Sequence, residues 1–185
     1  LAEGSVGTVY LARGVTGHGG PVEFGCSQYF CEWLFDKDRN GGGTFVDEAC
    51  YLVDGFVDYL GPVTEVSAFT ARIGYRDYLP ANVEDNAVAI LRFASGALGV
   101  IDSKWGQVGP APVRTSYHGS HGTIITGQSG VELFSTADLE SPDGWQPVDL
   151  ASRPTFGRHP ANLRGWRTDG GMTTGSGSGG AEQRY

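Results

Sequence analysis

The sequence predicts an α+β domain with an open, mostly antiparallel sheet and one principal buried helix packed on one face. One observation is an apolar segment over residues 41–61 whose spacing is helical. A second is that the segments after it are short and rich in β-forming residues, and a third is that Gly-rich turns separate them. Helix and strands that are segregated along the chain are typical of an α+β arrangement.

Length and composition favour one globular domain. The chain has 185 residues, of which 39% are hydrophobic, and this is enough for a sizeable core. A formal net charge of −8 argues against binding to nucleic-acid phosphates, because such proteins concentrate Lys and Arg. We find no run of 18 or more apolar residues, so we expect no membrane-spanning helix. We expect the domain to occupy residues 1–153.

The three cysteines indicate a reducing compartment. Cys26, Cys31 and Cys50 form no C-x-x-C pair, and Cys50 falls in the helix that we expect to be buried. We therefore predict reduced thiols in a cytoplasmic protein, with a Cys26–Cys31 disulfide as the less favoured alternative.

The segment before the helix is expected to hold one strand and a long loop. Residues 6–12 are β-prone and bounded by glycines, so they predict the first strand. Residues 14–43 are Gly-rich with few periodic apolar positions, and we expect a long loop that its aromatic residues keep ordered.

The helix has recognisable ends. Thr44 is the expected N-cap, and Asp47 and Glu48 fall in the first turn, where negative charge suits the helix dipole. Gly61-Pro62 is the expected stop.

One line of ionisable groups interrupts this apolar helix. At 3.6 residues per turn, Asp47, Tyr51, Asp54 and Asp58 fall within about 60° of one another. Apolar residues occupy both flanks of the line. A helix so apolar should be buried on nearly every side, so we expect its acidic stripe to face a cavity.

Short strands are expected after the helix. We predict them at 63–73, 86–93, 97–105, 113–117, 123–126 and 131–134, with Ser95-Gly96 as a two-residue hairpin turn. Both parities of 87–93 are mostly apolar, which predicts cover on both faces, by the helix and by a partner subunit.

The C-terminal segment is expected to be disordered. From 154 to 185 the pattern dissolves into an irregular, Gly/Ser-rich tail. The tail contains a G-x-G-x-x-G match at 175–180, but no predicted strand precedes it and no helix follows it. We therefore reject a dinucleotide site there.

Asp47 and Tyr51 are the strongest candidates for chemistry. They lie one helical turn apart, so a carboxylate and a phenol can address the same small ligand, and a tyrosine can relay a proton to a substrate hydroxyl. The structural alternative is a first-turn charge and a half-buried core aromatic, and residue chemistry alone slightly favours it. Asp54 and Asp58 are weaker candidates, since a solvated acidic edge explains them better.

The histidines give little indication of a metal site. His118 and His121 fall in an expected turn with no carboxylate nearby in sequence, so the pair does not favour ligation. His18 and His159 have the setting of loop residues. Neither a nucleophile motif nor a phosphate-binding P-loop is found.

The helix and its surroundings resemble a known family. Residues 41–47, then Tyr51 and Asp54, then 59–66, are similar to the start of the second domain in the glucose–fructose oxidoreductase / inositol dehydrogenase (Gfo/Idh/MocA) family. The flanking segments 4–9, 33–37 and 84–99 are similar to the family's G-x-[IL]-G-x-V strand, its aromatic-Asp segment and its E-D-x-A…F-x-x-G-A-x-G hairpin. The resemblance keeps the family's order over roughly residues 1 to 135.

The resemblance implies the substrate-binding domain of an NAD(P)-dependent oxidoreductase. Members act mostly on sugars and cyclitols, and an N-terminal Rossmann domain holds the cofactor. Many carry Asp-x-x-x-His on this helix with the histidine as acid/base. Here Tyr51 takes that position, as in the glucose–fructose oxidoreductase and dihydrodiol dehydrogenase branches. The resemblance thus implies Tyr51 and Asp47 as catalytic residues.

Four further residues are expected to line the substrate pocket. We expect Trp33, Asp54, Lys104 and Trp105 to bind substrate, with Trp105 stacking on a sugar face or, equally, closing the core. We expect NAD or NADP in the full-length enzyme and none on this chain alone, because no Rossmann half and no Glu-Lys-Pro motif are recognisable. The family's later helices are not recognisable beyond Pro154, so the chain has the character of a fragment cut at both ends or read out of frame near its end.

The expected partners are a small carbohydrate or polyol and a second copy of the chain, bound through the sheet face, with no nucleic acid or membrane. A non-catalytic oligomerisation or interaction module is the main alternative. A carboxylate glycosidase ranks low. It needs two carboxylates about 5–9.5 Å apart across a scissile bond. Asp47 and Asp54 lie two turns apart on one expected helix, and no second element is expected to supply the partner.

Overall fold

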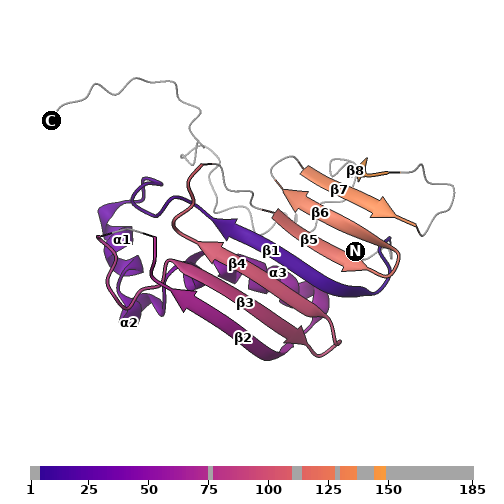
Figure 1. The fold of residues 1–185 in the computed structure, drawn as a ribbon, viewed down its shortest axis with the longest axis horizontal. Helices are drawn as coiled ribbons and strands as arrows, with labels where there is room; N and C mark the ends of the chain where they lie inside the picture. Colours follow the sequence, from indigo (N-terminus) through magenta and orange to yellow (C-terminus); the bar gives the residue numbers. More distant parts are fainter. Residues whose placement is uncertain (1–4, 75–76, 110–113, 128–129, 137–143, 149–185) are drawn as a thin grey trace, which may run out of the picture. The chain divides into compact units, whose positions relative to one another are not determined.

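The computed structural model describes residues 5–74, 77–109, 114–127, 130–136 and 144–148 (Figure 1). The chain divides into two units, Leu1–Asp149 and Leu150–Tyr185. The second unit lies outside the described residues, and so do the predicted disordered tail at 154–185, the rejected glycine motif and His159.

The described residues form one eight-stranded sheet in the order β2-β3-β4-β1-β5-β6-β7-β8. The strands are β1 (Val9–Gly17), β2 (Val63–Ala71), β3 (Asn86–Phe93), β4 (Leu98–Lys104), β5 (Arg114–Gly119), β6 (Gly122–Gly127), β7 (Gly130–Ser135) and β8 (Gln146–Pro147). All neighbours are antiparallel except β1 and β4, which are parallel. The predicted α+β class with a mostly antiparallel sheet is confirmed.

The segment before the principal helix differs from the prediction. β1 runs on to Gly17 and is followed by α1 (Gln28–Leu34) and α2 (Lys37–Asn40), where we expected a loop over 14–43. Ser27 caps α1 and Asp36 caps α2 through side-chain oxygens that accept backbone N–H groups. These helices are too short to show a clear period, and Gly14, which was expected to end the strand, lies inside β1.

The principal helix is present, but it is not uniform. A π-helical turn, η1 (Phe45–Ala49), leads directly into α3 (Cys50–Leu60). A π turn bonds i to i+5, so an α-helical projection does not hold across it. We placed Asp47 and Tyr51 on one line along the helix by assuming 3.6 residues per turn. The first turn does not have this period, so the prediction does not hold for Asp47.

The expectation that this helix is buried on nearly every side is wrong. Ala49, Phe56 and Leu60 are buried against the sheet, whereas Tyr51 is 76% exposed and Cys50 is also exposed. No described segment covers the outer side. The exposure of Cys50 also removes the premise from which the reduced-thiol argument began, although all three cysteines are free thiols here.

The core lies between α3 and the sheet, and in Figure 1 the helix lies behind the central strands. Phe56 packs edge-on against Tyr117 of β5 at a ring distance of 5.8 Å. The buried core members are Ala12, Ala49, Phe56, Leu60, Ala89, Leu91, Phe93, Ala97, Ile101 and Tyr117. None of the helices in the described part is long and apolar enough to cross a membrane.

β3 shows which face the helix covers. Ala89 and Leu91 are buried, whereas the residues that alternate with them, Val88 and Ile90, are 51% and 49% exposed. The helix cover that we predicted for this strand is confirmed, and the opposite face is bare in the single chain.

Replacing Gly55 with alanine is expected to stabilise the fold by about 1 kcal/mol, because alanine is that much better than glycine inside a helix. An added Cβ at Gly55 would meet only the Tyr117 hydroxyl, at 3.7 Å, which is an ordinary contact. Urea denaturation of the variant and the wild type checks this. A loss of stability would mean that the space between α3 and β5 is tighter than this distance indicates.

Candidate functional site around Asp47

The start of the helix is held by a residue from the loop before β3. Glu84 accepts the Gly43 and Phe45 N–H groups through Oε1 at 2.8 and 3.2 Å, and its carbonyl accepts the Thr44 N–H at 3.1 Å. A carboxylate at this position satisfies N–H groups that lack helical partners and suits the helix dipole. Glu84 therefore fixes the position of the turn that carries Asp47.

Thr44 does not cap the helix with its side chain, which corrects the prediction. Its backbone is already helical, and its hydroxyl lies 3.0 Å from the Ser103 hydroxyl of β4. Ser103 in turn donates to the Thr44 carbonyl at 2.9 Å. The expected cap is therefore a link between the helix and the sheet.

Two chain segments run side by side next to this turn. The His18 N–H donates to the Lys104 carbonyl at 3.1 Å, and the Gln107 N–H donates to the His18 carbonyl at 3.1 Å. Trp105, between them, donates its backbone N–H to the Asp85 carbonyl at 2.8 Å. These bonds fix His18 and Trp105 beside the helix start.

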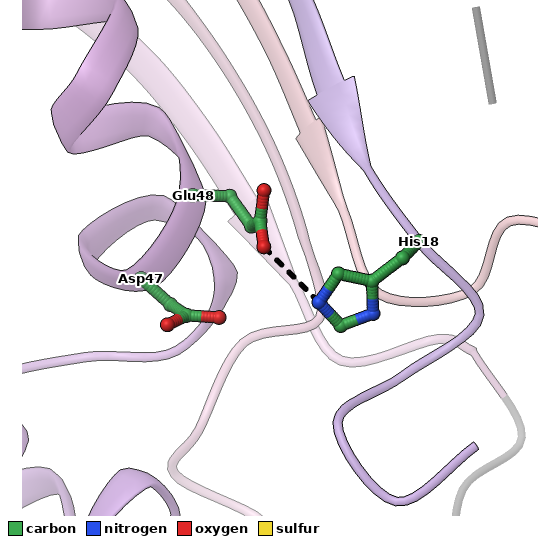
Figure 2. Close-up of side chains that lie close together, drawn as sticks. All are labelled: His18, Asp47 and Glu48. Atoms are coloured by element: carbon green, nitrogen blue, oxygen red, sulfur yellow. Dashed lines mark ion pairs between the residues drawn. The ribbon is translucent and has the colours of Figure 1, made fainter. Parts of the chain in front are cut away.

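Three ionisable side chains meet at this place (Figure 2). His18 Nε2 lies 3.0 Å from Glu48 Oε1, and Asp47 points toward the same space from the helix. The three residues are half-buried, and one possible ligand atom from each lies within 4.8 Å of the others. Trp105 Nε1 donates to Asp47 Oδ2 at 3.2 Å.

The hydrogen bonds around His18 define its tautomer. The Gly20 N–H donates to His18 Nδ1 at 3.0 Å, so this nitrogen presents a lone pair. The proton of the neutral ring is then on Nε2 and is donated to Glu48. The ring also stacks on Phe24 with centroids 5.0 Å apart.

This tautomer weakens the case for a metal ion. His18, Asp47 and Glu48 are the one set among the described residues with ligand atoms close enough for a metal. A metal-bound histidine needs its lone pair on the ligating nitrogen and donates its other N–H to an acceptor. Here Nδ1 faces a backbone donor instead, so the arrangement fits a hydrogen-bonded His–Glu pair better.

The two neighbouring carboxylates differ in their pKa. The hydrogen bond from His18 is the main reason that the pKa of Glu48 lies below its usual value, and the Thr16 hydroxyl bond at 2.9 Å adds to this. Burial, followed by the charge of Glu48, raises the pKa of Asp47. Paired groups whose pKa values are displaced in opposite directions are typical of acid–base sites.

The structure joins two of the predicted site residues, Asp47 and Trp105. The Trp105 ring is fully buried, at 0% exposure, so it closes the core and cannot stack on a sugar. Its contribution to the site is the N–H that it donates to Asp47.

Lys104 lies away from the site. It alternates with buried Ser103 along β4 and pairs with Asp102 at 2.6 Å, on the face that Val88 also shares. This is the sheet face opposite the helix, so Lys104 and Asp47 are not brought together.

The other predicted residues are exposed around the helix. Tyr51 points largely into solvent, and Trp33 is exposed on α1 beside Phe30 at a ring distance of 5.8 Å. Asp54 belongs to an open, mostly apolar groove of ≈ 480 Å³ along one side of the helix. The groove is lined by Phe45, Val46, Cys50, Val53, Asp54 and Val57. No hydrogen bond or ring contact in the described part links Tyr51, Trp33 or Asp54 to Asp47.

Sequence reasoning missed His18 and Glu48. His18 was assigned to a loop, and Glu48 only to the helix dipole. The available signals were a histidine within Gly17-His18-Gly19-Gly20 and two consecutive carboxylates. The other histidine pair shows no such chemistry, since His118 bonds to the Ser116 and Thr123 hydroxyls at 3.1 and 3.3 Å.

Residues 1–125, more than half of the chain, match the sequence profile of the GFO/IDH/MocA C-terminal domain. The chain belongs to this family. The Gfo/Idh/MocA resemblance inferred from the helix and hairpin motifs is thereby confirmed. No curated protein sequence matches the chain.

Solved structures with the same fold are oxidoreductases. Levoglucosan dehydrogenase in complex with NADH is 24% identical, with a TM-score of 0.66, over 80% of this chain and 41% of that protein. The WlbA dehydrogenase from Bordetella pertussis, in complex with NADH and UDP-GlcNAcA, is 25% identical, with a TM-score of 0.61, over 77% of this chain and 40% of that protein. A Klebsiella pneumoniae NAD binding oxidoreductase is 21% identical, with a TM-score of 0.64, over 78% and 40%. This chain thus spans about two fifths of the length of these Gfo/Idh/MocA relatives.

Proposed function

We propose that this chain is the substrate-binding domain of an NAD(P)-dependent oxidoreductase that acts on a sugar, a cyclitol or a related polyol. The observation that carries the proposal is the half-buried cluster at the start of the helix, where Trp105 donates to Asp47 and His18 pairs with Glu48. Relatives with this fold were solved with NADH and with sugars, including levoglucosan and UDP-GlcNAcA, which supports the substrate class.

The proposed chemistry divides the work between this chain and the rest of the enzyme. The described elements contain no strand, Gly-rich turn and helix in the order that a dinucleotide requires, so NAD or NADP would be held by a part that this chain does not span. That cofactor, when bound, supplies the hydride acceptor or donor. On this chain, Asp47 and Tyr51 would receive the substrate hydroxyl and exchange its proton.

The substrate-contacting wall is proposed from the exposed candidates. Trp33 and Asp54 remain candidates because they are accessible near the helix, and Trp105 acts through its bond to Asp47. We leave Lys104 out because it lies on the opposite face of the sheet. A cytoplasmic location stays a prediction from the free cysteines.

The test begins with the DNA before Leu1, which should encode an in-frame dinucleotide-binding half. With that half present, Tyr51→Phe should lower turnover by less than the roughly 10² expected of the group that exchanges the proton, because only the phenol's hydrogen bond to the substrate hydroxyl is lost. This chain alone should give no calorimetric signal with NAD(H). Tight binding of NAD(H) by the chain alone would contradict the proposed division.

A second copy of the chain is the proposed partner for the sheet face opposite the helix. Strand register places Phe69, Val88 and Ile90 on this face, and Phe69 is 85% exposed. Exposed apolar residues that lie next to one another mark interaction surfaces.

Phe69→Glu is expected to convert a dimer of this chain into monomers, because it places a charge in the apolar interface. Size-exclusion chromatography with light scattering measures the mass of both forms. Thr64→Glu, an exposed position near the end of the same strand, is the control and should leave the mass unchanged. A wild-type chain that is monomeric at high concentration would contradict the interface.

A further inference from the structure

We propose that Asp47 is the group that carries the exchanged proton, and that His18 and Glu48 are positioning residues that keep Asp47 in that role. This inference rests on the proposed function and names how its site works. His18 directly follows β1 and Glu48 lies in η1. The sequence analysis predicted neither of them as a site residue.

The hydrogen bonds distinguish the two carboxylates. Both Glu48 oxygens are occupied, Oε1 by His18 Nε2 at 3.0 Å and Oε2 by the Thr16 hydroxyl at 2.9 Å. Asp47 receives one recorded donor within the described residues, Trp105 Nε1 on Oδ2. Asp47 therefore has one oxygen that accepts no hydrogen bond from the described residues and can receive a substrate hydroxyl, whereas each Glu48 oxygen already accepts one.

His18 fixes which of the two stays ionised. The Gly20 N–H occupies Nδ1, so the ring can only donate from Nε2, and it donates to Glu48. A carboxylate that accepts two donors is stabilised in its charged form. The charged Glu48 then opposes a second negative charge on Asp47, which half-burial opposes as well.

The other groups around Asp47 carry no charge that would oppose this assignment. The titratable neighbours of Asp47 are His18, Glu48, Cys26 and Cys50. Partial burial raises the pKa of Cys26, and the pKa of Cys50 is also raised, so both thiols stay neutral. The Trp105 N–H stabilises the ionised form of Asp47, against the effects of burial and of Glu48. A carboxyl group that can both take up and release a proton is suited to general acid–base catalysis.

The proton balance of the step is simple. In oxidation, the substrate O–H bond breaks and its proton goes to the Asp47 carboxylate, while the carbon loses hydride to the dinucleotide of the proposed function and a C=O bond forms. In reduction, the protonated Asp47 returns the proton to the new alkoxide. Glu48 and His18 exchange no proton in either direction.

The test uses this chain alone, labelled with ¹³C at the Asp and Glu carboxyl carbons and titrated by NMR. We expect Asp47 to titrate at a higher pH than ordinary aspartate, and Glu48 at a lower pH than ordinary glutamate. Glu48→Gln should move the Asp47 midpoint down because it removes the neighbouring charge. His18→Phe should move the Glu48 midpoint up because it removes the donor.

One control variant keeps the result interpretable. Glu65→Gln, on the opposite sheet face beside Arg92, should move neither midpoint. Should His18→Phe fail to fold, Glu48→Gln alone still decides, since an unmoved Asp47 midpoint in that variant overturns the proposal.

A metal titration tests the rival explanation for the same residues. Zn²⁺ or Mn²⁺ alone, added to the chain in a calorimeter, should show no 1:1 site that depends on His18. A site of that kind, lost in His18→Phe, would overturn the proton role. None of these measurements needs a cofactor, so a full-length protein that binds no dinucleotide would contradict the proposed function and leave these titrations standing.

Discussion

Asp47→Asn in the full-length enzyme is expected to lower kcat by roughly two orders of magnitude or more, the usual contribution of a positioned acid–base group. Asparagine retains an oxygen that can accept the Trp105 N–H, which lies 3.2 Å from the aspartate. The fold should therefore survive, while the ability to take a proton is lost. Steady-state kinetics in both directions measure the effect, with circular dichroism to show that the domain is intact.

The pH dependence of the wild type gives a second readout of the same residue. Oxidation requires ionised Asp47, and burial and Glu48 raise its pKa from 3.8. The rate of oxidation should therefore fall on the acid side at a higher pH than an ordinary aspartate would give. Glu65→Gln serves as the charge-matched control. A near-normal kcat for Asp47→Asn would move the proton to Tyr51 and leave Asp47 with orientation alone.

Gly43→Ala is expected to destabilise the domain by about 3 kcal/mol, at the upper end of the cost of overpacking. A Cβ on Gly43 would approach the Glu84 carbonyl oxygen far inside van der Waals contact. Because that carbonyl accepts Thr44 and its own side chain accepts Gly43 and Phe45, neither segment can shift without losing bonds. Urea denaturation measures the free energy of unfolding.

Gly55→Ala is the matched control, because it makes the same chemical change inside α3. Its expected change in the free energy of unfolding has the opposite sign. If Gly43→Ala were as stable as the wild type, the link between Glu84 and the helix start would not hold Asp47 in place. The pair of variants therefore tests whether close approach, and not the loss of glycine as such, causes the effect.

Much of the fold could be predicted because period and turn chemistry are local signals. The helix, the hairpin between β3 and β4 and the three strands β5 to β7 were found, with bounds shifted by a few residues. The position of β1 in the sheet was not predicted, because its neighbours β4 and β5 lie about a hundred residues further along the chain. The short helices α1 and α2 were missed because seven and four residues show too little periodicity.

The site was predicted only in part, for a similar reason. Helical spacing and the family motif selected Asp47, and the structure places it among ionisable neighbours. Spacing could not show that η1 is a π turn or that Tyr51 is exposed. Nor could it bring His18 to Glu48, because these residues meet only when the end of β1 lies beside the helix start.

The place of β1 has a consequence for how the domain is made. Residues 9–17 are synthesised early, yet the strand lies between β4 and β5, whose last residue is Gly119. At ribosomal rates the nascent strand waits on the order of 10 s for both neighbours, with both of its edges unpaired. A ribosome that stalls before Gly119 would release a chain with one edge of β1 open, which is a template for aggregation.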